Sequence, residues 1–254
     1  MRDLVPVDDT LALRVPSVVA LEADAPDTSE LFAFMAEAEL RFETLRMRIV
    51  DRTLTARGER LETVEVALRH PGWARVVRRR DDSGLSTDYD VWIADGRVVK
   101  TYDARSQTAS VRPFTPQVRG ATSTDLPSFA RVWVPRTRLP NDSLADTFIH
   151  PRGLVRNVLG TGPLTQLGSV TLAGHREALV VRVDHPRTSH LLTDRPDRWL
   201  EIAVDRMTGL VLRLREQVGP RTTRHAEVTE LELGGALDDD VFALHISSDV
   251  RMLY

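Results

Sequence analysis

The stretch LRMRIVDRTLTARGERLETVEVAL, residues 45–68, decides the fold class. Apolar and polar side chains alternate in its first and last thirds, and Arg57-Gly58 lies between them as a turn. The apolar positions are Leu45, Met47, Ile49, Val64, Val66 and Leu68. A period of two is typical of strands with one buried face, and two such runs around a glycine turn predict an antiparallel hairpin.

Similar hairpin patterns extend to both sides of this stretch. Pro71-Gly72 precedes an apolar run at 73–77, and the run at 89–93 leads into Asp95-Gly96, a dipeptide that type I′ turns prefer. Further strands are expected at 98–102, 107–111, 170–172, 178–183, 199–204, 210–215 and 226–233. Short strands joined by tight turns favour an α+β fold with a large antiparallel sheet over a parallel one.

One amphipathic helix is expected before the first strand. Asp27 is a good N-cap, with Glu30 three positions later. Apolar residues then recur at helical spacing, namely Leu31, Phe34, Met35, Ala38, Phe42 and Leu45. This helix should pack its apolar face on the sheet. Residues 1–26 have no sustained period and are interpreted as an N-terminal arm, which leaves 27–254 as one domain.

A proline-rich segment interrupts the strands. Five prolines between 113 and 143 exclude long regular structure there, and 144–159 is expected to be helical with a break at Pro151. The segment also has apolar residues that should not face water: Phe129, Val132, Trp133, Phe148, Leu154, Val155 and Val158. We therefore predict that about residues 113–160 form a lid over the concave side of the sheet.

Composition excludes several classes of function. The net charge of −3 gives no broad electrostatic reason to bind nucleic acid. The absence of cysteine excludes disulfides, thiol nucleophiles and cysteine-ligated metals. No apolar run is long enough for a transmembrane helix, and the seven-residue uncharged run at 15–21 is short for a signal peptide. As encoded, the chain is expected in the cytoplasm, or outside it if the true start differs.

Known catalytic patterns do not occur. The seven histidines never have the i, i+4 spacing of a helical metal site, and no Gly-x-Ser-x-Gly elbow or phosphate-binding glycine motif occurs. The sequence therefore predicts a protein that is not an enzyme and that uses no metal or cofactor. Of the remaining features, the tryptophans are the most suggestive, and they either fill a core or line a concave cavity.

The order of these elements resembles a known family. The carrying stretches are Phe42-Glu43-Thr44-Leu45, Pro71-Gly72-Trp73-Ala74-Arg75, Trp92-Ile93-Ala94-Asp95-Gly96, 200–205, 208–213 and 237–244. Over about residues 28–246 they resemble the LolA-like superfamily of lipoprotein-sorting proteins, which includes regulators of the MucB/RseB type. This resemblance implies a strongly curved half-barrel with helices on its concave face. It also implies binding of acyl chains, lipoproteins or hydrophobic peptides without chemistry.

Two functional hypotheses follow from the residues and the resemblance. The first is a non-enzymatic carrier or sensor for a hydrophobic ligand such as a lipid, an acyl chain or a lipoprotein. Its expected cavity residues are Phe34, Met47, Ile49, Val64, Val66, Arg75, Trp92, Trp133, Leu154 and Val158. The resemblance suggests Arg75, because the family often has a basic residue at that place. The alternative is a regulatory module that binds a partner protein through the sheet edge or the proline-rich segment.

Overall fold

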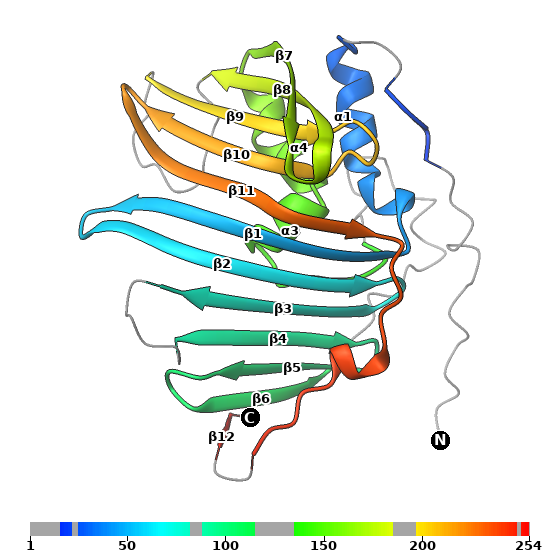
Figure 1. Cartoon of the computed structure of the whole chain (residues 1–254), viewed down its shortest axis with the longest axis vertical. Helices are drawn as coiled ribbons and strands as arrows, with labels where there is room; N and C mark the ends of the chain where they lie inside the picture. The colour runs from blue at the N-terminus through cyan, green and yellow to red at the C-terminus, as the bar shows by residue number, and fades with distance from the viewer. Residues whose placement is uncertain are drawn as a thin grey trace, which may run out of the picture.

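The computed structural model describes residues 16–21, 25–81, 88–114, 135–184, 197–247 and 250–253. Within these ranges a single unclosed sheet of twelve strands has the order β12-β6-β5-β4-β3-β2-β1-β11-β10-β9-β8-β7 (Figure 1). The strands are β1 (Thr44–Thr55), β2 (Gly58–Arg69), β3 (Trp73–Arg80), β4 (Tyr89–Asp95), β5 (Val98–Asp103), β6 (Thr108–Pro113), β7 (Leu164–Leu172), β8 (Arg176–Asp184), β9 (Arg198–Asp205), β10 (Val211–Val218), β11 (Arg221–Leu233) and β12 (Arg251–Leu253). The predicted α+β half-barrel is confirmed.

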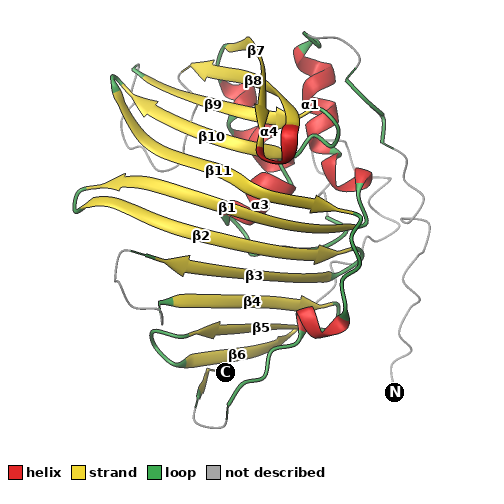
Figure 2. Ribbon diagram, in the orientation of Figure 1, coloured by secondary structure: helices red, strands yellow, loops and turns green. Residues whose placement is uncertain are grey.

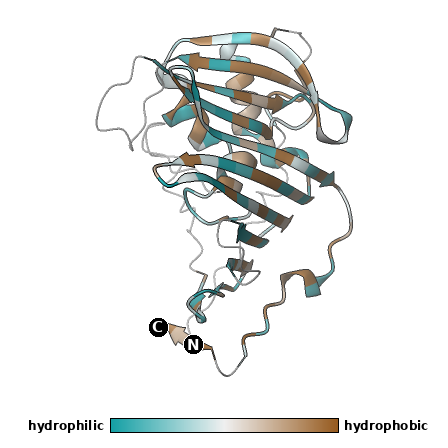
Figure 3. Cartoon of the chain, turned by 60° about the vertical axis from the view of Figure 1, so that its left-hand side comes forward, coloured by the Kyte–Doolittle hydropathy of each residue, from teal (hydrophilic) through white to brown (hydrophobic). Residues whose placement is uncertain are grey.

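The central hairpin has the predicted register. Met47 pairs with Val66 and Ile49 with Val64 across β1 and β2, so these side chains share one face. All four are at most 4% exposed. Figure 3 shows the same alternation as bands of hydrophobic and hydrophilic colour along the strands. A shift of one residue would expose the whole apolar set, and the register is therefore fixed by burial.

The sheet is not wholly antiparallel. β12 pairs with β6 in parallel through Arg251, Met252 and Leu253, whereas the other pairings of the described strands are antiparallel. Sequence patterns did not predict this short strand, because three residues are too few to show a period. β12 and β7 form the two ends of the sheet.

The first helix begins where the sequence predicts and ends earlier. α1 (Thr28–Ala36) is capped by Asp27, whose Oδ1 accepts hydrogen bonds from the backbone N of Ser29 at 2.7 Å and of Glu30 at 3.0 Å. A 3₁₀ turn, η2 (Ala38–Arg41), follows. The helical spacing of apolar residues thus continues past the end of the helix. Phe42 lies in an extended segment and Leu45 in β1, and both side chains are buried in the core.

The α-helices lie on the concave face of the half-barrel (Figure 2). The other helical elements are α3 (Leu144–Ile149), α4 (Arg152–Asn157), η4 (Leu159–Thr161), η5 (Ala173–His175) and η6 (Asp239–Phe242). Pro151 separates α3 from α4, as predicted. Phe148, Ile149 and Leu159 are fully buried in the same core as Phe34, so this part of the expected lid is packed core. The rest of it, with Phe129, Val132 and Trp133, lies outside the described residues.

The convex face has a smaller core of its own. Side chains of β2, β3 and β4 pack there against Leu237 and Phe242 of the C-terminal segment. Two arginines hold that segment: Arg69 donates to the carbonyl of Leu237 at 2.9 Å, and Arg75 to those of Val241 and Ala243 at 3.2 and 3.1 Å. In Figure 1, η6 accordingly lies on the side of the sheet opposite to α1, α3 and α4.

Candidate functional site

The concave face is filled by helices in one part and hollow in another. α4 packs against α1, and α3 contacts β10 and β2. Beyond β2, a cavity of about 540 Å³ lies between the sheet and the turn that precedes α3. Its lining residues include Arg60, Glu62, Val64, Val76, Arg78, Asp90, Trp92, Thr101, Asp103, Pro140, Asp142, Leu144, Ala145 and Arg224. Cavities of about 300–1,000 Å³ are the usual size for small-molecule ligands.

One end of the cavity is apolar. Val76 pairs with Trp92 across β3 and β4 and with Val66 of β2, and Val64 lies two residues further along β2, in register with Arg78. Val64 and Val76 are 4% and 6% exposed, and Trp92 is partly buried against the main core. Leu144 and Ala145, from the start of α3, form the facing wall. This end is continuous with the core and offers an aromatic surface to a ligand.

The other end of the cavity is charged. Arg78 Nε lies 2.9 Å from Asp90 Oδ1, and Arg60 Nη2 lies 3.3 Å from Glu62 Oε1. Arg224 donates to both carboxylate oxygens of Asp51, with Nε 3.0 Å from Oδ1 and Nη2 2.7 Å from Oδ2. Charged groups at these positions would be costly in a dry core, and pairing with hydrogen bonds makes them tolerable.

The two ends follow from one strand register. Inward-facing positions on β2 run Val66, Val64, Glu62, Arg60 from the helix-covered part outward, and Glu62 pairs with Arg80 of β3. Because a strand rises about 3.3 Å per residue, the apolar row of Val76 and Trp92, in register with Val66, lies about 13 Å from the row of Glu62, and the row of Val64, Arg78 and Asp90 lies between them. The cavity is therefore polarised along the strands.

The predicted cavity residues are divided among several places. Val64 and Trp92 line the concave cavity. Phe34, Met47, Ile49 and Val66 are buried in the main core at 0–4% exposure, and Leu154 and Val158 are partly buried against it. Trp133 lies outside the described residues. The burial predicted for the first helix and hairpin is confirmed, whereas ligand binding by this set stays a prediction.

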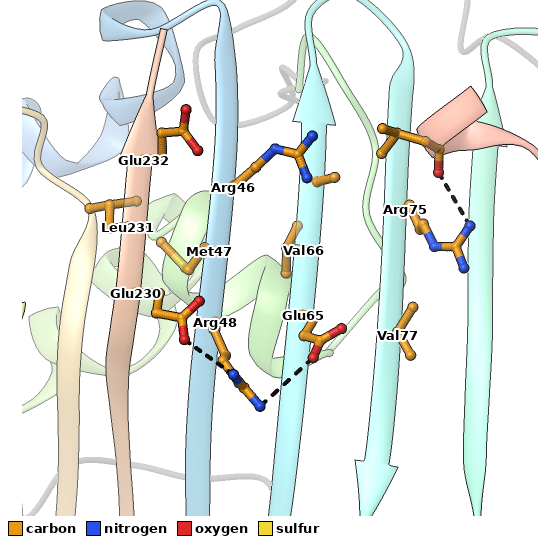
Figure 4. Close-up of a pocket in the computed structure, with 12 residues that line it drawn as sticks. Arg46, Met47, Arg48, Glu65, Val66, Arg75, Val77, Glu230, Leu231 and Glu232 are labelled. Carbon is orange, nitrogen blue, oxygen red and sulfur yellow. Dashed lines mark hydrogen bonds and ion pairs between the residues drawn. The ribbon is translucent and has the colours of Figure 1, made fainter. Parts of the chain in front are cut away.

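Arg75 does not line the concave cavity. In register with Ala67 and Ile93, it points to the convex face and lines a groove of about 490 Å³ there (Figure 4). Of the other predicted residues, Met47 and Val66 border the same groove as Arg75. In the same groove Arg48 lies between Glu230 at 3.1 Å and Glu65 at 3.9 Å. Arg75 itself bonds to backbone carbonyls. These charges are balanced within the groove, and Arg75 has a structural contact there, so the concave cavity is the better candidate.

The tryptophans of the described chain have three different settings. Trp92 lines the concave cavity. Trp73 packs on the convex face, with its ring centroid 5.6 Å from that of Phe242. Trp199 lies between two guanidinium groups, 5.7 Å from Arg182 and 5.9 Å from Arg215. Only Trp92 among these three combines the aromatic surface with a cavity.

The described ranges have no group of three or more His, Asp or Glu residues placed to hold a metal ion. Across the same ranges, the helices are too short or too polar to cross a bilayer. The buried His70 has a structural contact: its Nδ1 lies 2.8 Å from Thr137 Oγ1, and burial lowers its pKa to about 3.

Sequence patterns missed the charged end of the cavity, although they contain a signal for it. Leu45, Met47 and Ile49 point inward at every second position of β1, and Asp51 is the next position in that series. On β2, Glu62 follows Val66 and Val64 in the same way. A carboxylate at a position where the period calls for an apolar residue indicates a cavity or a buried ion pair. The contributions of Arg224 and Asp90 come from distant strands and have no comparable signal.

Comparisons with known proteins bear on the fold. No protein-family model matches the chain, and no curated protein matches it significantly. Among solved structures, it is similar to MucB, with 19% identity and a TM-score of 0.48 over 89% of this chain and 65% of MucB. The chain is also similar to the MucA/MucB complex of Pseudomonas aeruginosa, with 18% identity and a TM-score of 0.47 over 87% of this chain and 62% of that one.

A LolA superfamily protein from Nitrosomonas europaea gives 10% identity and a TM-score of 0.33, over 87% of this chain and 99% of that one. The chain thus spans slightly less than two thirds of the MucB chains. The chain is thus similar to solved structures of MucB and of a LolA superfamily protein, the superfamily that its sequence resembles.

Proposed function

We propose that this chain is a non-enzymatic binding protein that holds the apolar part of a lipid-like ligand in the concave cavity. The supporting observation is the cavity of about 540 Å³ with Val64, Val76 and Trp92 along one wall. The helices fill the rest of the concave face with fully buried side chains, such as Phe34 and Phe148. A ligand would therefore enter beyond β2 and lie along the strands.

The dependence of affinity on the length of the ligand's alkyl chain is the sharpest test of this function. Each methylene group that leaves water contributes about 0.8 kcal/mol, which is roughly fourfold in affinity. A series of n-alkanols from hexanol to dodecanol, titrated calorimetrically, should therefore bind more tightly by about this factor per methylene, until the cavity is full. Alkanols are suitable because their head group is small and uncharged. Affinity that does not rise with length would refute an apolar binding site.

A pair of tryptophan variants tests the location. Trp92→Ala should weaken decanol binding about tenfold or more, because it removes an aromatic wall of the cavity. Trp199→Ala is the matched control, since Trp199 lies among arginines and does not line the cavity. Equal losses in the two variants would place the alkanol elsewhere.

A second candidate function is binding of a partner protein at the sheet end. β7 is a nine-residue strand at the edge of the sheet, and no described strand pairs with its outer side. Leu167, 49% exposed, is the extra residue of a bulge there. A partner strand could add to this edge. A co-purified protein lost in Leu167→Lys and kept in Trp92→Ala would favour this function.

A further inference from the structure

The charged end of the cavity contains a carboxylate oxygen with an unmet hydrogen-bonding capacity. The Glu62 side chain is 92% buried, being 8% exposed, and its Oε1 accepts no hydrogen bond within the described structure. Arg60 and Arg80 approach it at 3.3 and 3.5 Å, which is ion-pair proximity without hydrogen-bond geometry. Buried acceptors nearly always have a donor, so this oxygen points to a group that a ligand would supply.

The arginines of the same cavity already have carboxylate partners. Arg78 is held by Asp90 at 2.9 Å and Arg224 by Asp51 at 2.7 Å. Arg60 is the nearest cation to Glu62 itself. A phosphate or carboxylate head group would have to replace these partners to gain a guanidinium contact. The site is therefore poorly suited to an anionic head.

The charges around the cavity are balanced. The described lining has the carboxylates of Glu62, Asp90, Asp103 and Asp142 and the guanidinium groups of Arg60, Arg78 and Arg224, and Arg80 adds a fourth cation 3.5 Å from Glu62 and 2.7 Å from Asp90. The head group is therefore selected by the hydrogen bond that it can donate, not by a net charge of the cavity. The hydrogen bond from an ammonium group to a carboxylate is also stronger than one from a hydroxyl group.

We propose that the cavity selects amphiphiles with a protonated amine head, which donates to Glu62 Oε1 while the apolar tail lies toward Val64, Val76 and Trp92. The inference rests on the proposed function, since it needs the tail to occupy the apolar end. The separation of about 13 Å between the two rows gives such a molecule one orientation along the strands. Glu62 is thus a specificity-determining residue rather than part of the apolar wall.

Three probes with one tail and different heads test the inference. Decylamine, decanol and decanoate, each below its micelle concentration, would be titrated calorimetrically at pH 7 and physiological salt. We expect decylamine to bind about tenfold more tightly than decanol, and decanoate to bind most weakly. If decanol equals decylamine, or decanoate is the tightest, the head-group inference is overturned while the rise of alkanol affinity with length still supports the proposed function.

A pair of isosteric variants on one strand locates the effect. Glu62→Gln should lower decylamine affinity to about that of decanol and change decanol affinity much less, because a hydroxyl group can also hydrogen-bond to the neutral amide. Glu65→Gln is the matched control, because Glu65 lies on the same strand but lines the convex groove. A preference for decylamine that survives Glu62→Gln overturns the role of Glu62. If Glu62→Gln does not fold, Glu62→Asp can replace it because it keeps the charge. The order in which the wild-type protein binds decylamine, decanol and decanoate still tests the head-group inference.

Failure of the two proposals gives different results. If no probe binds, or if affinity does not depend on the tail, both the proposed function and the head-group inference are wrong. If the tail matters and the head does not, only the inference is wrong. Decylamine binding that persists after Trp92→Ala but is lost after Glu62→Gln would indicate a site for the amine without a site for the apolar tail. That result would refute the proposal that the cavity selects amphiphiles.

Discussion

Replacing Phe34 by alanine distinguishes a packed core from a ligand cavity on the concave face. Phe34 is 0% exposed in α1, and its ring faces the Arg41 guanidinium carbon at 3.9 Å from the centroid. Gly209, in the β9–β10 turn, lies so close that a Cβ there would be 3.2 Å from the Phe34 ring. A ring enclosed on all sides has little room for its neighbours to collapse into the space it leaves.

The expected loss for Phe34→Ala is about 3–5 kcal/mol in the free energy of unfolding, because the transfer and cavity terms add. The contact with Arg41 contributes to the same loss and is not counted separately, since the two effects share one ring. Urea unfolding followed by circular dichroism measures it, with the m-value unchanged if only stability differs. Decanol affinity should stay the same, because Phe34 does not line the concave cavity.

Phe32→Ala is the matched control on the same helix. Phe32 is only partly buried against the core, so its loss should be less than half as large. Two equal and small losses, below about 1 kcal/mol, would contradict the packed core. If Phe34→Ala also weakened decanol binding, the ligand would lie among the helices and the assignment of the cavity beyond β2 would be wrong.

Two further predictions concern stability. Gly209→Ala should destabilise the fold by several times more than Gly96→Ala, since both glycines have positive φ, of 81° and 77°, but only a Cβ at Gly209 would meet an atom, the Phe34 carbonyl oxygen at 2.8 Å. Equal losses in urea would show that backbone strain alone matters. His70 has its pKa lowered to about 3 by burial. Between pH 6.5 and pH 3, His70 is protonated in the unfolded chain and neutral in the folded one. The free energy of unfolding should therefore fall by about 1.4 kcal/mol for each pH unit of acidification in this range. His70→Gln should remove that part of the slope, whereas the exposed His245→Gln should not.

The sheet could be predicted from the sequence because its central strands carry a local signal. Leu45, Met47 and Ile49 alternate with arginines, and the period of two has only one explanation when one face is buried. The helix start at Asp27 was equally local, since a capping side chain bonds to the next turn. The end of the helix could not be predicted from a local signal, because Phe42 keeps the helical spacing although it lies in an extended segment.

Long-range contacts account for what could not be predicted. Arg75 was expected in the cavity, but its partners are the carbonyls of Val241 and Ala243, more than 160 positions away. Which face of β3 receives the C-terminal segment depends on a core that forms only in three dimensions. A short strand such as β12 likewise exists because β6 offers it a partner, and its own residues show no period.

The inward phase of the central hairpin changes from apolar to charged at the place where the helix cover ends. Ile49 gives way to Asp51, and Val64 to Glu62, and these two acids pair in register across β1 and β2. Like charges opposite each other on neighbouring strands are unfavourable for the sheet, and both side chains are largely buried. Apolar residues at these positions would satisfy folding at least as well, since buried ion pairs are weak sources of stability. Asp51 accepts hydrogen bonds from Arg224, whereas the Oε1 atom of Glu62 lies in ion-pair range of Arg60 and Arg80 and accepts a hydrogen bond from neither. The acid that folding explains least is therefore the one that faces the cavity.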